Sequence, residues 1–211
     1  MLGPVRVAVV DYGMCNLDSV RRAFEELGAK AFVTDDPVAL ERADRIVLPG
    51  VGAFPDAMRN LRARGLDDAL AKQVFDGGAP FLGVCLGMQL LATLGHEGEE
   101  TEGLRWFDAD VVRFTPSTSG ERVPHIGWNE VDVTAGDSPL FAGIPPRADF
   151  YFVHSFHVVC RRSADVLATT PYCGGFTSAI ARDNVFATQF HPEKSQAHGL
   201  RMLRNFLELS C

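Results

Sequence analysis

The stretch "PFLGVCLGMQLL", residues 80–91, decides the fold and raises the question of function. The apolar run Pro80–Val84 predicts a buried strand, and the residues after Cys85 favour a helix. Gly83 and Gly87 flank the cysteine two residues away on either side, where a Cβ would clash in a sharp turn. The pattern Gly-x-Cys-x-Gly is thus the cysteine counterpart of a nucleophile elbow, and the helix start favours the thiolate. The alternative is an inert buried cysteine, which is common in proteins.

Around this turn the first half of the chain alternates strands and helices. Such alternation predicts right-handed crossovers and a parallel sheet covered by helices on both faces. The second half is β-rich with short segments, which predicts antiparallel strands appended to that sheet, before a closing helix from about Ser195. We expect one α/β domain, flavodoxin-like, over residues 1–211. The expected early strands are 5–11, 31–34, 45–50 and 80–84; the expected helices are 17–27, 55–64, 66–76 and one from Gly87; the later strands fall within 108–114, 130–133, 150–160, 164–170, 176–183 and 185–190.

Composition narrows the classes of function. The chain has 211 residues, 46% of them hydrophobic, and a formal net charge of -7, which disfavours broad contact with nucleic acid or an anionic membrane. No apolar run approaches the roughly 20 residues of a membrane span, and the start is not a signal peptide. An odd number of widely spaced cysteines without C-x-x-C predicts neither disulfides nor a zinc knuckle, and favours the cytoplasm. These cysteines are Cys15, Cys85, Cys160, Cys173 and Cys211.

A thiolate nucleophile needs a base and a group that orients the base. In "FATQFHPEKS" His191 ends an apolar strand and Glu193 follows two residues later. Pro192 forces His191 to be extended, so this pair is held rigidly and suits the base and acid of a triad with Cys85. For the segment that contains His191 and Glu193, the alternatives to a triad are a surface turn and a metal site. Against a metal, His154 and His157 are three apart in one expected strand and so face opposite sides; we expect no metal and no cofactor.

A second glycine turn, "LPGVGAF" at residues 48–54, ends another expected parallel strand, where open α/β sheets bind ligands. Gly50 and Gly52 let its backbone approach a ligand and present N–H groups. A phosphate loop is the alternative, but the third glycine of G-x-G-x-x-G is missing and G-K-[ST] does not occur. We predict an oxyanion hole formed by the N–H groups of Val51 and Leu86.

In this order, "PGVG", "GVCLGMQLL" and "QFHPEKS" resemble the class I glutamine amidotransferases. "DYGMCNLDSV", "VPHIGWN", "YFVHSF" and "HPEKSQAHGLRMLRNF" narrow the resemblance to the HisH family, the glutaminase subunits of imidazole glycerol phosphate synthase. The resemblance implies that Cys85 attacks the side-chain amide of L-glutamine, with His191 moving protons and Glu193 orienting it. It further implies that the residues holding the glutamine are Gly50, Gly52, Gln89, Glu97, His154, Ser155 and Phe156.

The same resemblance implies a partner, a (β/α)₈ cyclase of the HisF family, which would form a heterodimer with this chain and receive its ammonia. It places the joint face at Asn16, Trp128, Asn129, Tyr151 and Lys194. Cys15 departs from the family, because many relatives have glycine there. Three alternatives stay open: a glutaminase for another synthase, a cysteine-elbow hydrolase or peptidase, and a non-catalytic binding subunit.

Overall fold

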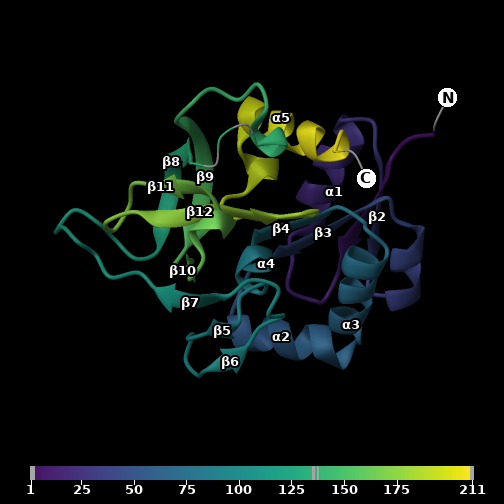
Figure 1. Cartoon of the computed structure of the whole chain (residues 1–211), viewed down its shortest axis with the longest axis horizontal. Helices are drawn as coiled ribbons and strands as arrows, with labels where there is room; N and C mark the ends of the chain where they lie inside the picture. The colour runs from purple at the N-terminus through teal and green to yellow at the C-terminus, as the bar shows by residue number, and fades with distance from the viewer. Residues whose placement is uncertain (1–2, 135, 137, 210–211) are drawn as a thin grey trace.

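The computed structural model describes residues 3–134, 136 and 138–209, and most of its strands form one large sheet (Figure 1). The strand order is β2-β1-β3-β4-β13-β12-β10-β7-β5-β6, with β11, β8 and β9 branching from β12. The strands are β1 (Arg6–Val10), β2 (Lys30–Thr34), β3 (Arg45–Gly50), β4 (Phe81–Cys85), β5 (Leu94–Gly95), β6 (Thr101–Glu102), β7 (Ala109–Arg113), β8 (His125–Val133), β9 (Ala148–His154), β10 (Phe156–Cys160), β11 (Val166–Thr170), β12 (Phe176–Arg182) and β13 (Val185–Thr188).

The first five strands in that order run parallel, and four of them, β1 to β4, are those for which the alternation in the sequence predicted this. Helices α1 and α5 cover one face of this half and α2 and α3 the other, so the predicted fold class is confirmed (Figure 1). The α-helices are α1 (Leu17–Glu26), α2 (Phe54–Ala63), α3 (Leu66–Ala71), α4 (Leu86–Gln89) and α5 (Gln196–Leu207). None of the helices in the described part of the chain is long and apolar enough to cross a membrane.

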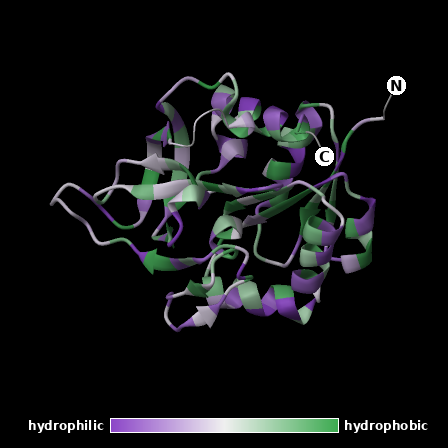
Figure 2. Ribbon diagram, viewed as in Figure 1, coloured by the Kyte–Doolittle hydropathy of each residue, from purple (hydrophilic) through white to green (hydrophobic). Residues whose placement is uncertain are grey.

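Side chains of alternate strand residues fill a separate hydrophobic core on each face of the sheet. In β1, Val7 and Val9 pack on the side of α1 and α5, whereas Ala8 and Val10 pack on the side of α2 and α3. This follows from the period of two along a strand. Figure 2 shows the same arrangement, with apolar residues along the central strands and hydrophilic ones along the outer helix faces.

Three expectations about the elements were wrong. Strand β13 lies between β4 and β12 and is parallel to β4, although the sequence suggested an antiparallel strand. The segment 150–160 is two strands broken at Ser155, and the rings of His154 and His157 both contact Phe114 instead of facing opposite sides. The helix after Cys85 is a single turn, because Leu91 and the residues after it turn back toward β5.

The loop 115–122 is almost wholly exposed. Cys15, Cys85, Cys160 and Cys173 are free, and Cys211 lies outside the described residues. Within the described ranges, no group of three or more His, Cys, Asp or Glu side chains is placed to bind a metal ion.

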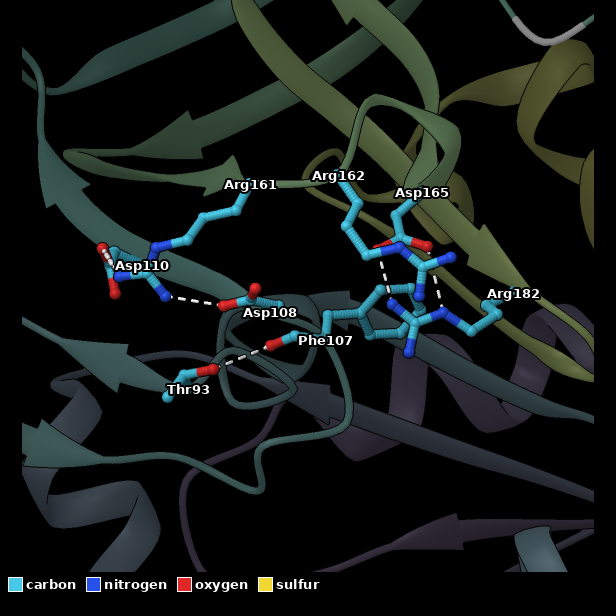
Figure 3. Close-up of polar contacts among 8 residues, drawn as sticks. All are labelled: Thr93, Phe107, Asp108, Asp110, Arg161, Arg162, Asp165 and Arg182. Atoms are coloured by element: carbon cyan, nitrogen blue, oxygen red, sulfur yellow. Dashed lines mark hydrogen bonds and ion pairs between the residues drawn. The ribbon is translucent and has the colours of Figure 1, made fainter.

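A buried carboxylate joins the antiparallel half to the loop between β6 and β7 (Figure 3). Asp165 is only 2% exposed and accepts hydrogen bonds from the guanidinium of Arg182, with Nε at 3.0 Å. Arg182 also donates to the carbonyl of Trp106 and lies over the ring of Phe107, 4.7 Å from its centroid. Arg161 lies close by but pairs with Asp108 on the surface.

We expect Asp165→Asn to lower the free energy of unfolding by about 2 kcal/mol, because it leaves the guanidinium of Arg182 without its buried counter-charge. The matched control is Asp108→Asn, whose pair with Arg161 is exposed and is worth less than about 1 kcal/mol. Urea unfolding of both variants measures the difference. Equal losses would show that burial does not strengthen the Asp165 pair.

Candidate active site

The register of three parallel strands creates the site. Gly50 at the end of β3 is paired with Cys85 at the end of β4, and Val84 is paired with Thr188 at the end of β13. His191 follows β13 by three residues. The predicted oxyanion turn, nucleophile and base therefore meet at one edge of the sheet, at the carboxyl ends of its strands.

Cys85 has the backbone of a nucleophile elbow. Its φ of 55° and ψ of -109° lie in a region that a non-glycine residue adopts only under strain, of order 1–3 kcal/mol. A Cβ on Gly87 would lie 1.8 Å from the carbonyl oxygen of Leu48, and one on Gly83 would lie 2.8 Å from that of Gly87. The predicted steric need for both glycines is confirmed.

His191 and Glu193 form the rigid pair that the sequence predicted. His191 is extended before Pro192, and its Nδ1 lies 2.8 Å from a carboxylate oxygen of Glu193. Both side chains are almost fully buried. Because the carboxylate can only accept, Nδ1 carries a proton and Nε2 is the atom left for chemistry.

The charge on Cys85 reaches His191. Burial lowers the pKa of His191, but the thiolate of Cys85 and the carboxylate of Glu193 together raise it to about 10. Nε2 of His191 has no hydrogen-bond partner within the described part of the chain. The arrangement thus favours an imidazolium at neutral pH, with the Cys85 sulfur and the Glu193 carboxylate as the neighbours that stabilise its charge.

A buried glutamine side chain, Gln189, contacts the sulfur and was missed by sequence reasoning. Its Nε2 points toward Sγ of Cys85 at 3.7 Å, and its Oε1 accepts from Gln89, which also donates to the carbonyl of Phe156. The hydrogen bond from Gln89 to Oε1 of Gln189 fixes the orientation of the Gln189 amide, so that its Nε2–H faces the sulfur of Cys85. The signal available was its spacing of two from His191, which puts both on one side of an extended chain.

A cavity of about 520 Å³ opens beside Cys85. Six of the seven residues predicted to hold the glutamine line it; Gly50 does not. The remaining wall residues include Val51 and Leu86, which were predicted for the oxyanion hole. The predicted residues that line it are Gly52, Gln89, Glu97, His154, Ser155 and Phe156.

Glu97 is partly buried and is not simply one more solvated charge of its acidic segment. Its carboxylate accepts a hydrogen bond of 2.8 Å from the N–H of Phe54, the first residue of α2. A carboxylate is favourable at a helix N-terminus. Glu97 therefore has a structural bond already, while it still lines the cavity.

The imidazole of His154 is committed to contacts within the protein. Its Nδ1 donates to the carbonyl of Phe156 at 2.8 Å, so its Nε2 accepts from Nδ1 of His125 at 3.1 Å. Asn129 in turn lies 3.3 Å from Nε2 of His125. Burial lowers the pKa of His125 to about 4 and that of His154 to about 3, so both rings are neutral. His125 was missed by sequence reasoning.

The N–H of Val51 is already bonded. It donates to the carbonyl of Met14 at 2.8 Å, and so it does not serve an oxyanion in this conformation. The N–H of Leu86 is the first in α4, where it has no acceptor within the helix. The predicted oxyanion hole thus needs the peptide before Val51 to rotate.

The residues predicted for the joint face lie at the surface, and three of them are in contact. The rings of Trp128 and Tyr151 meet edge to face at 6.0 Å, and Nζ of Lys194 lies 6.0 Å from the Tyr151 ring. Trp128 is 47% exposed, which excludes an ordinary core role for it, and Asn16 is also exposed. The hydroxyl of Ser195 accepts from the N–H of Tyr151 and donates to the carbonyl of His191. The backbone of His191 is therefore joined to that of Tyr151 both through this hydroxyl and directly, by an N–H···O bond of 2.9 Å.

Comparisons with known proteins identify the family. The profile of the glutamine amidotransferase class-I family matches residues 8–209, so the chain belongs to that family. Solved structures with the same fold include PurLQS from Thermotoga maritima, with a TM-score of 0.75 and 19% identity over 98% of this chain and 99% of that one. A glutamine amidotransferase, also from Thermotoga maritima, has a TM-score of 0.64 and 21% identity, over 98% and 82% of the two chains.

Curated relatives narrow the family further. Imidazole glycerol phosphate synthase subunit HisH 1 of Campylobacter jejuni is 46% identical over 96% of this chain and all of the relative. The HisH subunit of Ruegeria pomeroyi is 48% identical over 95% of this chain and 97% of its own length, and that of Syntrophotalea carbinolica is 48% identical over 95% and 98%. Within the class-I amidotransferases, the chain belongs to the HisH family.

The coupling of Cys85 to His191 predicts a titration. We expect His191 to stay protonated above pH 8 in the wild-type protein and to lose its proton at lower pH in Cys85→Ala, because burial then acts against a weaker opposing charge. Nitrogen-15 NMR of the imidazoles over pH 5–10 measures this. His125, whose pKa burial lowers to about 4, is the internal control and should stay neutral over this range in both proteins. An unchanged His191 titration would show that the thiolate does not act on it.

Proposed function

We propose that this chain hydrolyses L-glutamine to glutamate and ammonia through a thioester on Cys85. The HisH family membership and the meeting of Cys85, His191 and Glu193 beside one cavity support the proposal. The carrying observation is that the register of β3, β4 and β13 brings Cys85 and the His191–Glu193 pair to one edge of the sheet.

The chemistry follows from the starting charges. The Cys85 thiolate attacks the side-chain carbonyl carbon of glutamine, and the oxyanion that forms is stabilised by the N–H of Leu86 and, after rotation, by that of Val51. Nε2–H of His191 gives its proton to the amide nitrogen, so ammonia leaves and the thioester remains. Neutral His191 then takes a proton from water as the hydroxide adds to the thioester. The thiolate departs, and the site returns to its starting charges.

The cavity suits the head group of glutamine. Glu97 supplies an acceptor for the α-ammonium, and the backbone at residues 154–156 offers donors for the α-carboxylate. Because the imidazole of His154 is bonded to Phe156 and His125, its contribution is to hold this backbone in place. Gly52 allows the glutamine to lie close to the turn.

We propose that the ammonia passes directly to a (β/α)₈ cyclase subunit, which docks on the surface around Asn16, Trp128, Asn129, Tyr151 and Lys194. The exposed ring of Trp128 is the kind of aromatic anchor that protein interfaces use. Direct transfer matters because ammonia released to water becomes ammonium, which is not a nucleophile. The cyclase would form imidazole glycerol phosphate and an aminoimidazole carboxamide ribotide, a step of histidine biosynthesis in the cytoplasm.

We expect Cys85→Ala to reduce glutamine hydrolysis at least 10³-fold, because no thioester can form. With the cyclase present, its complex should still make product from added ammonium salt. Cys160→Ala is the matched control, since that thiol lies far along the sheet in β10, and it should keep glutamine-dependent synthesis. A Cys85→Ala protein that still delivers glutamine nitrogen would overturn the proposal, and turnover of esters or peptides in preference to glutamine would favour a hydrolase.

We expect the isolated chain to be a weak glutaminase, because the Val51 N–H is held by Met14. A cyclase with its substrate bound should raise glutamine turnover on the order of 10²- to 10³-fold, the effect of gaining one oxyanion donor. Steady-state glutamate release with and without the cyclase and its substrate measures this. Equal rates would remove the coupling.

A further inference from the structure

Rotation of the peptide between Gly50 and Val51 changes the hydrogen-bond partners of two groups, the N–H of Val51 and the carbonyl of Gly50. The N–H of Val51 and the carbonyl of Gly50 belong to the same trans peptide and point in opposite directions. With the N–H on Met14, the Gly50 carbonyl points away from the loop 11–16. If the N–H turns into the cavity, as the proposed function requires, that carbonyl turns toward the loop. A buried carbonyl there needs a hydrogen-bond donor.

The loop offers one such donor beside Gly50. Tyr12 is fully buried; its hydroxyl lies beside the Cys15 thiol and has no nitrogen or oxygen partner among the residues that the structure describes. A Cβ built on Gly50 would lie only 2.0 Å from this hydroxyl oxygen, so the oxygen sits directly against the Gly50 backbone. A buried hydroxyl without a partner costs free energy. The Tyr12 hydroxyl lies beside the Gly50–Val51 peptide, so it can donate to the Gly50 carbonyl once that peptide has rotated.

Tyr12 keeps its proton at neutral pH. Burial raises the pKa of Tyr12 well above 10, and the nearby thiols of Cys15 and Cys85 raise it further. The hydroxyl is therefore able to donate.

Cys15 is not the competing donor. Its Sγ donates to the carbonyl of Pro49 at 3.2 Å and lies 3.7 Å from that of Val10, so its hydrogen is already in use. The contact with Pro49 fixes the peptide that precedes Gly50. Rotation is thereby confined to the peptide between Gly50 and Val51.

We propose that the Tyr12 hydroxyl receives the Gly50 carbonyl after this rotation and so holds the oxyanion turn in its active form. Tyr12 is then a positioning residue: it touches neither substrate nor thiolate, and it acts through the turn. The proposal rests on the proposed glutaminase function and adds the group that stabilises the rotated turn.

The test is Tyr12→Phe, which removes one oxygen and keeps the ring. We expect kcat for glutamine in the cyclase complex with its substrate to fall about tenfold, with KM unchanged, so that the ratio of stimulated to basal rate falls as well. Thermal unfolding should show no loss of stability, since the hydroxyl has no nitrogen or oxygen partner in the resting protein. Tyr172→Phe is the matched control, because that hydroxyl bonds to the backbone of Arg122 instead, and it should keep full stimulation.

A second measurement needs no substitution at position 12. The sequence has three tyrosines, and 3-fluorotyrosine places a fluorine beside each hydroxyl. Adding the cyclase substrate to the preformed complex should shift the fluorine signal of Tyr12, which is assigned by elimination with Tyr151→Phe and Tyr172→Phe. Full stimulation in Tyr12→Phe, or an unmoved Tyr12 signal in a stimulated complex, overturns the proposal while the glutaminase stands. A wild-type complex without any stimulation overturns the rotation itself and this proposal with it.

Discussion

The positive-φ backbone of Cys85 is the constraint on which the site depends. It holds the sulfur above the ends of β3 and β13, and it persists because Gly87 lies against Leu48 and Gly83 against Gly87 too closely for any side chain. The strain is offset by the two cores on either side of the sheet. The short strand-to-helix turn, the cavity beside it and the approach of His191 all follow from this one conformation.

The sequence predicted those parts of the molecule that local patterns specify. β3 was predicted over its full length, and the elbow follows from two glycines around Cys85. Strand β13 was placed in the wrong orientation, because pairing with β4 joins residues about a hundred positions apart and leaves no local mark. Gln189, His125 and the role of Tyr12 were missed for the same reason. Each depends on a side chain meeting another segment. Only Gln189 had a local signal, its spacing of two from His191, and that spacing does not by itself indicate a contact with the sulfur.

Two polar networks meet at the carbonyl of Phe156 beside the cavity, and they are built from different groups. In the first, Gln89 and Gln189 are amides that cannot ionise, so the donor facing the sulfur is fixed at every pH. In the second, His125 and His154 could ionise, but burial keeps both neutral, and the direction of their hydrogen bonds is set by the Phe156 carbonyl. His191 is the one buried histidine near the cavity, among the residues described, that is driven toward its charged form, which separates the reacting base from its neighbours.

The bond from Glu97 to the start of α2 has a consequence for the turn before that helix. Phe54 follows Gly52 by two residues, so one carboxylate anchors the downstream end of the glycine turn while facing the cavity. A cation that enters the cavity competes with the helix for that carboxylate. A molecule bound in the cavity can thus loosen the end of the glycine turn next to α2 without contacting the turn itself.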